Sequence, residues 1–428
     1  MVLVAEGRVV LETLMIERSH FLVIEGFEIT GSSRGITLGA CDSVVIRRNY
    51  IHDITNYGIM NYRSDRTLIE HNRIERSSIE HGIYLSDSGT GVVVSDNFIA
   101  HTQINGIHMN GALVSPVVRR NVIFRSGTYP AFEGGAGITY IGGASDGLIT
   151  NNLLIDVGGQ GMTVLSSGAK IRNNVLDGWT WSGILTSAST THLELTNNIF
   201  VSASASPLGI DASARPSLKA DYNFYVLGSQ AITGSEPFAT WQASGQDMHG
   251  QTGASPFAHT NAGREPNAAL YALAPQSSAV DTGAPELEDA FLPPGLGERR
   301  SDLGIFGGPD NNWTSGSIPE LPDGGVPGPA DSSTPGPIDA TSVASDSGLV
   351  VADAGATMLG DVGPGATSDA ASSGIDAGER PGVDAARPPE EPVGSGCGCG
   401  VAPVAAGVLG WAWAGVPLLR WRRGRRQE

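Results

Sequence analysis

The chain contains the run Ser43-Val44-Val45-Ile46-Arg47-Arg48-Asn49-Tyr50-Ile51-His52, and Gly58-Ile59 follows after a short gap. Apolar and polar residues alternate in the run, and neither segment has helical periodicity, so both are predicted to be short strands. The same pattern recurs along the first 200 residues or so. Each copy has an Asn within the alternating run and a Gly at the second strand. The Asn positions are Asn49, Asn72, Asn97, Asn121, Asn152, Asn174 and Asn198, and the Gly positions are Gly35, Gly58, Gly82, Gly106, Gly137, Gly161 and Gly183.

The repeat has a nearly constant period, because neighbouring copies are 22 to 25 residues apart except for one step of 31. A coil of this length with two or three short strands is typical of one turn of a parallel β-helix. Successive turns would lie about 4.8 Å apart, so equivalent residues would form columns. We therefore predict an all-β solenoid with an asparagine ladder and two apolar columns. The columns are Ile24, Ile46, Ile69, Val94, Val118, Ile149 and Ile171, and Ile29, Ile51, Ile74, Ile99, Ile123, Leu154 and Leu176.

Two segments, Phe21-Leu22-Val23-Ile24-Glu25-Gly26-Phe27-Glu28-Ile29-Thr30-Gly31 and His81-Gly82-Ile83-Tyr84-Leu85-Ser86, are similar to turns of a known family. They resemble the right-handed parallel β-helix repeat family, within the pectate-lyase-like superfamily. The resemblance covers about residues 20 to 310 and implies a right-handed parallel β-helix. The superfamily includes lyases, hydrolases, epimerases and adhesins, so the resemblance leaves the activity open.

Composition divides the chain into four parts. Residues 1–201 hold the turns, and the irregular residues 202–311 are expected to cover the last open turn. Residues 312–396 carry 13 acidic residues against two arginines, and are predicted to be a disordered stalk of Pro, Gly, Ala, Ser and Asp. This stretch contributes −11 of the net charge of −18, so the acidity says little about the ligand of the folded part. The repeats have no basic stripe, and no nucleic acid partner is expected.

Residues 397–428 form the fourth part. The motif Gly396-Cys397-Gly398-Cys399-Gly400 precedes an uncharged run over residues 401–419. Nineteen helical residues span about 28 Å, enough for the hydrocarbon core of a membrane, so the run is predicted to be a single transmembrane helix. A cluster of arginines follows, which would stay in the cytoplasm and leave the stalk and the β-helix outside. The arginines are Arg420, Arg422, Arg423, Arg425 and Arg426.

This tail resembles the MYXO-CTERM type of myxobacterial sorting signal over about 33 residues. The resemblance implies that a membrane protease processes the chain near Cys397 or Cys399 and that the mature protein stays at the cell surface. The alternative is an ordinary single-span tail anchor. The first residues, Met1-Val2-Leu3-Val4-Ala5-Glu6-Gly7-Arg8, lack the basic and apolar regions of a signal peptide, so we expect an upstream signal and cap.

Candidate site residues follow the glycine column. The residue before each Gly gives Arg34, Tyr57, His81, Asn105, Ala136, Gln160 and Ser182, and the position two residues after it gives Thr37, Met60, Tyr84, His108, Thr139, Thr163 and Leu185. A third column holds Asp53, Arg76, His101, Arg125 and Asp156, and this column is also consistent with a solvated row of ion pairs. The long step adds an insertion near residues 126–136, whose aromatic side chains would form a cleft wall. An elongated groove with repeated sites predicts a linear extracellular polysaccharide as partner.

The chemistry predicted for such a groove is β-elimination on a uronic-acid polymer. Arg76 or Arg125 would neutralise the substrate carboxylate, His81 or His108 would remove the neighbouring proton, and Tyr84 would protonate the leaving oxygen. The pattern assigns no definite cofactor, but Ca²⁺ could replace the arginine, with Asp87, Asp96 or Glu133 as ligands. Glycoside hydrolysis would need two facing carboxylates, for which only Glu80 and Glu133 are candidates. The substrate-binding residues would be Tyr57, Asn105, Arg125, Tyr129 and Phe132.

The sequence thus favours a surface-anchored β-helix that binds or cleaves polysaccharide, as a lyase or an epimerase if it is an enzyme. Two alternatives stay open. One is a non-catalytic adhesin or structural protein of the cell surface. The other is a carbohydrate-binding scaffold that has lost its catalytic activity. No metal, nucleotide or nucleophile signature is present in the sequence.

Overall fold

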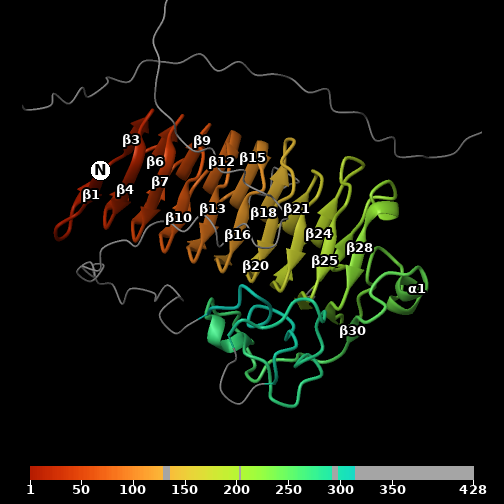
Figure 1. Ribbon diagram of the computed structural model, residues 1–428. Coiled ribbons are helices and arrows are strands. Elements are labelled where there is room, and N and C mark those ends of the chain that lie inside the picture. Colours follow the sequence, from red (N-terminus) through yellow and green to blue (C-terminus); the bar gives the residue numbers. More distant parts are fainter. Residues whose placement is uncertain (129–134, 202–203, 292–296, 314–428) are drawn as a thin grey trace, which may run out of the picture. The chain divides into compact units, whose positions relative to one another are not determined.

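The computed structural model describes residues 1–128, 135–201, 204–291 and 297–313 (Figure 1). Several predicted features therefore lie outside the described residues: Tyr129, Phe132 and Glu133 of the insertion, nearly all of the stalk over 312–396, the pair Cys397 and Cys399, and the membrane segment 401–419. In the described ranges, no helix is long and apolar enough to cross a membrane.

The chain winds into a solenoid of three sheets, and each regular turn adds one strand to each sheet (Figure 1). Neighbouring strands within a sheet are parallel, and the partners in successive turns are about two dozen residues apart in the chain. This topology confirms the predicted all-β parallel β-helix.

Sheets A, B and C are named in the order in which the chain first enters them. Sheet A consists of β1 (Val2–Val4), β4 (His20–Glu25), β7 (Asp42–Arg47), β10 (Leu68–Glu70), β13 (Val93–Ser95), β16 (Val117–Arg119), β19 (Leu148–Thr150), β22 (Lys170–Arg172), β25 (Glu194–Thr196) and β28 (Lys219–Asp221). Sheet B consists of β2 (Val10–Leu11), β5 (Glu28–Thr30), β8 (Tyr50–Ile54), β11 (Arg73–Ser77), β14 (Phe98–Ala100), β17 (Val122–Phe124), β20 (Leu153–Val157), β23 (Val175–Trp179), β26 (Ile199–Val201), β29 (Phe224–Val226) and β30 (Gln251–Thr252).

Sheet C carries the candidate site. It consists of β3 (Leu14–Glu17), β6 (Arg34–Gly39), β9 (Tyr57–Tyr62), β12 (His81–Thr90), β15 (Asn105–Val114), β18 (Ala136–Ile141), β21 (Gln160–Val164), β24 (Ser182–Thr186) and β27 (Leu208–Gly209). The described residues contain three short helices: η1 (Arg215–Ser217) lies between β27 and β28, α1 (Phe238–Ala243) lies between β29 and β30, and η2 (Ala268–Tyr271) follows β30.

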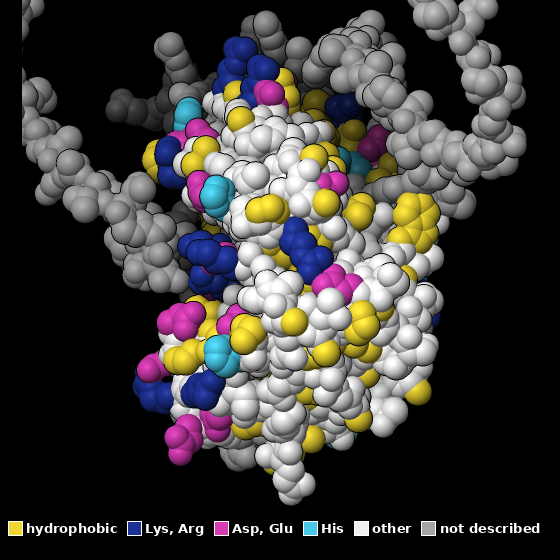
Figure 2. Space-filling view, turned by 90° about the vertical axis from the view of Figure 1, so that its right-hand side faces the viewer, with side chains coloured by type: hydrophobic (Ala, Val, Ile, Leu, Met, Phe, Trp, Pro, Cys, Tyr) yellow, Lys and Arg dark blue, Asp and Glu magenta, His cyan; other side chains and the backbone are white. Residues whose placement is uncertain are grey.

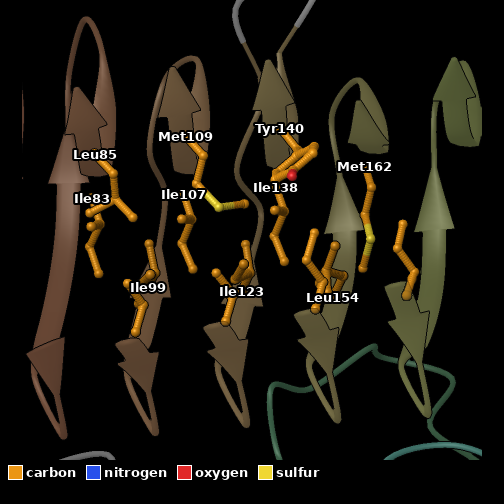
Figure 3. Close-up of a cluster of buried hydrophobic side chains, with 14 of the residues drawn as sticks. Ile83, Leu85, Ile99, Ile107, Met109, Ile123, Ile138, Tyr140, Leu154 and Met162 are labelled. Atoms are coloured by element: carbon orange, nitrogen blue, oxygen red, sulfur yellow. The ribbon is translucent and has the colours of Figure 1, made fainter. Parts of the chain in front are cut away.

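The strand register confirms both apolar columns. Ile46 pairs with Ile24 and Ile69 in sheet A, and Ile74 pairs with Ile51 and Ile99 in sheet B. Inside the solenoid, side chains of sheet C point toward those of sheet B (Figure 3). Each fully buried aliphatic side chain contributes about 1.5 to 3 kcal/mol, so the columns supply most of the stabilisation of each turn.

The asparagine ladder runs along the bend between sheets A and B. Asn121 is typical: its Nδ2 donates to the carbonyls of Val94 (2.9 Å) and Arg119 (3.0 Å) and to Oδ1 of Asn152 (2.9 Å). Its Oδ1 accepts from the backbone N–H and Nδ2 of Asn97, both at 3.0 Å. Each amide therefore bonds to polar groups of its own turn, of the preceding turn and of the next one. The same pattern links all seven predicted positions.

The ladder extends two turns beyond the predicted positions. Asn198 donates to Oδ1 of Asn223, and Asn223 donates to Oδ1 of Asp247. The second oxygen of Asp247 accepts from the hydroxyl of Tyr225 and from Nε1 of Trp241, each at 2.8 Å. A carboxylate only accepts hydrogen bonds, so Asp247 ends the ladder without requiring another turn.

The segment after residue 201 differs from its expected role. The boundary expected there falls within the sheets, because β28, β29 and β30 still pair with earlier strands. The end of the core is covered by α1, whose Trp241 is fully buried in the main apolar cluster.

Residues beyond α1 cover the side of the solenoid instead of its end. They pack on an apolar strip of the outer face of sheet B that includes Val122, Leu153 and Val175. Asn151 also donates to the carbonyl oxygens of Ile305 (2.9 Å) and Gly307 (2.7 Å). The sequence pattern missed this role. Periodicity alone cannot tell whether an apolar residue of a short strand points into the core or outward to a covering segment.

The glycine column has a steric cause. A Cβ at Gly106 would lie 2.6 Å from Cγ2 of Ile123 and 2.7 Å from the carbonyl oxygen of Gly137 in the next turn. Contacts this short leave no room for a side chain, so this position requires glycine. Where the chain passes from sheet B to sheet C, the backbones of successive turns are therefore in direct contact. The residue before each Gly then begins a strand of sheet C and lies in the column that carries the candidate site.

Replacement of the terminal carboxylate tests the ladder. In Asp247→Asn the amide oxygen must still face the two donors of Asn223, so its NH₂ group faces Nε1–H of Trp241. We expect the free energy of unfolding to fall by about 2 kcal/mol, because a buried donor loses its acceptor. In a Trp241→Phe background the same change should cost at most about half as much. Equal costs in both backgrounds, measured by denaturant unfolding, would contradict this assignment.

Candidate functional site

The outer face of sheet C brings the two predicted columns together. In the register of the sheet, His81 pairs with Asn105, Asn105 with Ala136, Ala136 with Gln160, and Gln160 with Ser182. The second column pairs Tyr84 with Met60 on one side and with His108 on the other. Residues that are about 24 positions apart in the chain are therefore direct neighbours on one surface.

Four rings form a cluster on this face, hereafter the ring cluster: Tyr57 of β9, His81 and Tyr84 of β12, and His108 of β15. The His81 and His108 rings meet edge to face with centroids 4.3 Å apart. Tyr84 stacks on His108 at 5.0 Å and lies 5.1 Å from Tyr57. Three of the four predicted catalytic residues and one predicted substrate-binding residue thus lie in mutual contact.

A chain of hydrogen bonds fixes the tautomers of both histidines. Oδ1 of Asn105 accepts from the backbone N–H of Ala136 (3.0 Å) and from the hydroxyl of Thr139 (2.9 Å), so its Nδ2 must be the group that faces Nδ1 of His81 at 3.2 Å. Nδ1 of His81 then accepts, and Nε2 carries the proton and donates to Nδ1 of His108 at 2.7 Å. The remaining proton of His108 is on Nε2, which is buried and has no hydrogen-bond partner among the described residues.

Burial keeps both histidines neutral. It lowers the pKa of His81 to about 2, with a smaller effect from the adjacent His108, and it lowers the pKa of His108 to about 4. Neither ring has a free lone pair, since both Nδ1 atoms accept hydrogen bonds. The predicted role of His81 or His108 as general base therefore finds no support in this geometry, which makes His108 a hydrogen-bond donor.

Two residues next to the ring cluster supply charge. A carboxyl oxygen of Glu80 lies 3.3 Å from Nε2 of His81, and burial raises the pKa of this carboxyl. Burial and the Glu80 charge also raise the pKa of Tyr57 to about 12. The Arg34 guanidinium lies over the Tyr57 ring at 5.9 Å. Among the described residues, no carboxylate pairs with Arg34.

The predicted cations of the site lie elsewhere. Arg76 belongs to β11 of sheet B, where it binds Asp53 through two bonds of 2.6 and 2.9 Å and holds the pKa of that carboxyl well below its usual range. Arg125 pairs with Asp156 at 3.0 Å and stacks on Phe124. Both arginines thus belong to a row of ion pairs beside sheet B and do not contact the ring cluster.

The carboxylates considered as Ca²⁺ ligands are also paired. Asp87 binds Arg63, and Asp96 is buried with both oxygens bonded to Arg120 at 2.7 and 2.8 Å. In the described ranges, no group of three or more His, Cys, Asp or Glu side chains is arranged to hold a metal ion.

The outer face of sheet C carries further polar atoms that are buried and have no hydrogen-bond partner among the described residues. They recur at the outward positions of several strands. These atoms are Thr37 Oγ1 on β6, His108 Nε2 on β15, Gln160 Oε1 and Thr163 Oγ1 on β21, and Ser182 Oγ on β24. Buried polar atoms of native proteins nearly always bond to protein, water or ligand, so each of these atoms is expected to have a partner other than the described residues.

The sequence matches the family model described as "Right handed beta helix region" over residues 12–146 and 80–225. No curated protein matches the sequence significantly.

Several solved structures are similar to this chain at low identity. A pectate lyase, Pel9A, is 13% identical, with 72% of this chain and 86% of that chain covered and a TM-score of 0.39. A variant of DFA-IIIase from Arthrobacter chlorophenolicus A6 in complex with DFA-III is 14% identical, with coverages of 54% and 76% and a TM-score of 0.30. A tailspike protein variant of E. coli bacteriophage HK620 in complex with a pentasaccharide is 13% identical, with coverages of 59% and 58% and a TM-score of 0.32.

The hydrogen-bond chain predicts the behaviour of both histidines in solution. Two-bond ¹H–¹⁵N correlation spectra should place the proton on Nε2 of His81 and His108 and show no titration above roughly pH 5. Because the folded pKa values lie below the unfolded value of about 6.5, the histidines stabilise the fold above that pH and this contribution is lost as the pH falls. In Asn105→Ala, the donor to His81 is missing and both tautomers of His81 should appear. A protonated Nδ1 in the unmodified chain would contradict the assignment.

Proposed function

The chain belongs to the right-handed beta helix family, and from this premise we propose that it binds an acidic extracellular polysaccharide on the outer face of sheet C. The observation that carries the proposal is the row of buried, unpartnered polar atoms that recurs from β6 to β24 beside the ring cluster. A linear polysaccharide presents hydroxyl groups at regular intervals, so its repeat suits donors and acceptors placed on parallel strands about 4.8 Å apart. Aromatic faces such as those of Tyr57 and Tyr84 suit the apolar faces of sugar rings.

An acidic polymer is favoured by the position of Arg34. Its guanidinium is adjacent to the ring cluster and has no carboxylate partner among the described residues. A planar guanidinium binds a carboxylate through two parallel hydrogen bonds, which fits the carboxylate of a uronic acid. In this assignment Arg34 takes the part that the sequence pattern gave to Arg76 or Arg125.

Cleavage by β-elimination is a second candidate function, favoured by the Glu80 carboxyl beside His81. The Glu80 carboxylate would take the proton from the carbon next to the uronate carboxylate. A carbon–carbon double bond then forms as the glycosidic bond to the leaving oxygen breaks, and the Tyr84 hydroxyl supplies the proton to that oxygen. His108 Nε2–H would donate to the negative charge that develops on the substrate. The alternative is a non-catalytic adhesin that uses the same face.

Binding is tested with the full chain in mild detergent on an array of pectate, alginate, glycosaminoglycans and neutral polysaccharides. We expect at least one acidic polymer to bind. Arg34→Ala should weaken that binding about tenfold or more, with reduced salt dependence, because it removes the cation that faces the substrate. The matched control Arg76→Ala should change the affinity less than twofold, since Arg76 is already paired with Asp53. The absence of binding to every polymer would overturn the proposal.

Cleavage is tested on the polymers that bind, by the absorbance of unsaturated uronate. In the lyase mechanism, Glu80→Gln and Tyr84→Phe should each abolish the product while the affinity stays within a few-fold. Binding without product from the unmodified chain would favour the adhesin.

We also propose that residues 401–419 anchor the protein in a membrane, with the β-helix outside the cytoplasm, and that the tail is a sorting signal processed near Cys397 or Cys399. The support is the uncharged run followed by the arginine cluster. These residues lie outside the described ranges, so the proposal depends on the sequence pattern.

A single charge tests the anchor. Leu409→Asp places a carboxylate at the middle of the run, at a cost of about 2.5 to 3.5 kcal/mol in a membrane. In bacterial cells that express the full chain, we expect the unmodified protein to sediment with membranes and Leu409→Asp to shift to the soluble fraction. Leu349→Asp, in the predicted stalk, is the control and should stay with the membranes. An unmodified chain in the soluble fraction would contradict the anchor.

A further inference from the structure

A pocket lies on sheet C beyond the ring cluster, toward the C-terminal end of the solenoid. It has a volume of about 580 Å³. It is lined by Gln160 of β21, by Ser182 and Leu185 of β24 and by Leu208 of β27. Trp181 stands at its edge with 46% of its surface exposed, which is unusual for a tryptophan in a part of the protein that is otherwise well packed.

Among the described residues, the pocket lining carries no charged side chain. Its remaining members are small or amide residues: Ala205, Ser206, Gly209, Gln230 and Gly234. The C-terminal end of the solenoid faces the viewer in Figure 2, where charged side chains gather mainly along one side and the opposite side is mostly uncharged. A ligand with a formal charge would be desolvated here without a partner, whereas a neutral ring would not.

Two polar atoms within the pocket lack partners among the described residues. Gln160 is only 2% exposed and Ser182 only 6%, yet Oε1 of Gln160 and Oγ of Ser182 form no hydrogen bond. An exposed indole face beside a buried amide oxygen and a buried hydroxyl combines a stacking surface with hydrogen-bonding groups. This combination suits a sugar ring, which has apolar faces and hydroxyl groups at its edge.

The pocket continues the column that contains His81. Ser182 lies four strand steps from His81 along sheet C, a distance of about 19 Å. We infer that this pocket binds a neutral sugar ring of the same polysaccharide, stacked on Trp181 and bonded to Gln160 and Ser182. The inference rests on the proposed function and extends it, because the polymer is then a heteropolysaccharide with an acidic unit near Arg34 and an uncharged unit near Trp181.

The test uses the full chain in mild detergent and the polysaccharide that it binds best on the array. Trp181→Ala should weaken binding at least about tenfold, Trp181→Phe should retain part of the affinity, and Phe21→Ala, which removes an exposed ring far from the pocket, should have no effect. Neutral gluco-, galacto- and manno-oligosaccharides serve as competitors, with galacturonic-acid oligosaccharides as the charged comparison. At least one neutral probe should compete in the unmodified chain and fail to do so in Trp181→Ala.

Gln160→Leu and Ser182→Ala separate binding from folding. An unpartnered buried polar atom does not stabilise the fold, so both changes should leave the melting temperature unchanged or raise it while they weaken binding several-fold. If either change lowers the melting temperature and leaves binding intact, the atoms serve the structure and the inference is overturned.

Polymer binding that is insensitive to Trp181→Ala, or competed for only by charged probes, would overturn the inference and leave the proposed function standing. If the unmodified chain binds no polymer, both are overturned.

Discussion

The structure depends on one constraint: the backbone must turn sharply between sheets A and B within the interior, where no water can satisfy its polar groups. The asparagine ladder meets this constraint, because each side-chain amide bonds to carbonyls of its own and the preceding turn and to the amide of the next one. Each turn consequently completes the hydrogen bonds of its neighbour, and the last one needs an end group. Asp247 is that end group, and Trp241 of α1 both bonds to it and covers the apolar core.

The same stacking determines what the three sheets can do. The outer face of sheet B carries an apolar strip and a row of ion pairs, and the strip is covered by the C-terminal residues that bind the side chains of Asn151, Asn173 and Asn197. Sheet C carries rings and polar atoms on its outer face, several of them without partners among the described residues. Buried polar atoms of native proteins nearly always have a partner. Those on sheet C lie beside the ring cluster, so the proposed ligand is assigned to this face.

Within sheet C, one backbone amide determines the chemistry of the ring cluster. The N–H of Ala136 can only donate, which orients Asn105, which in turn sets the tautomer of His81 and then that of His108. The outcome is a buried, neutral pair of imidazoles that donates a hydrogen bond and cannot remove a proton. Charge next to the cluster comes from the less buried Glu80 and Arg34. The proposed base and the proposed carboxylate-binding cation are therefore residues outside the pattern of histidines and tyrosines.

The sequence by itself determined the solenoid, its apolar columns, the ladder and the neighbours of each residue along sheet C. The reason is that residues one period apart in the chain lie side by side on paired strands of successive turns. It also contained the signals for Asn223 and Asp247, which continue the spacing of the ladder. The sequence left two roles open for Arg76 and Arg125, a row of ion pairs and a place in the site, and the tertiary structure decided for the ion pairs. It also showed that Arg34, beside the ring cluster, has no carboxylate partner among the described residues. It alone also revealed the role of the C-terminal residues and the pocket at Trp181. These features depend on hydrogen-bond partners and burial between segments that have no common period, and such contacts leave no repeat in the sequence.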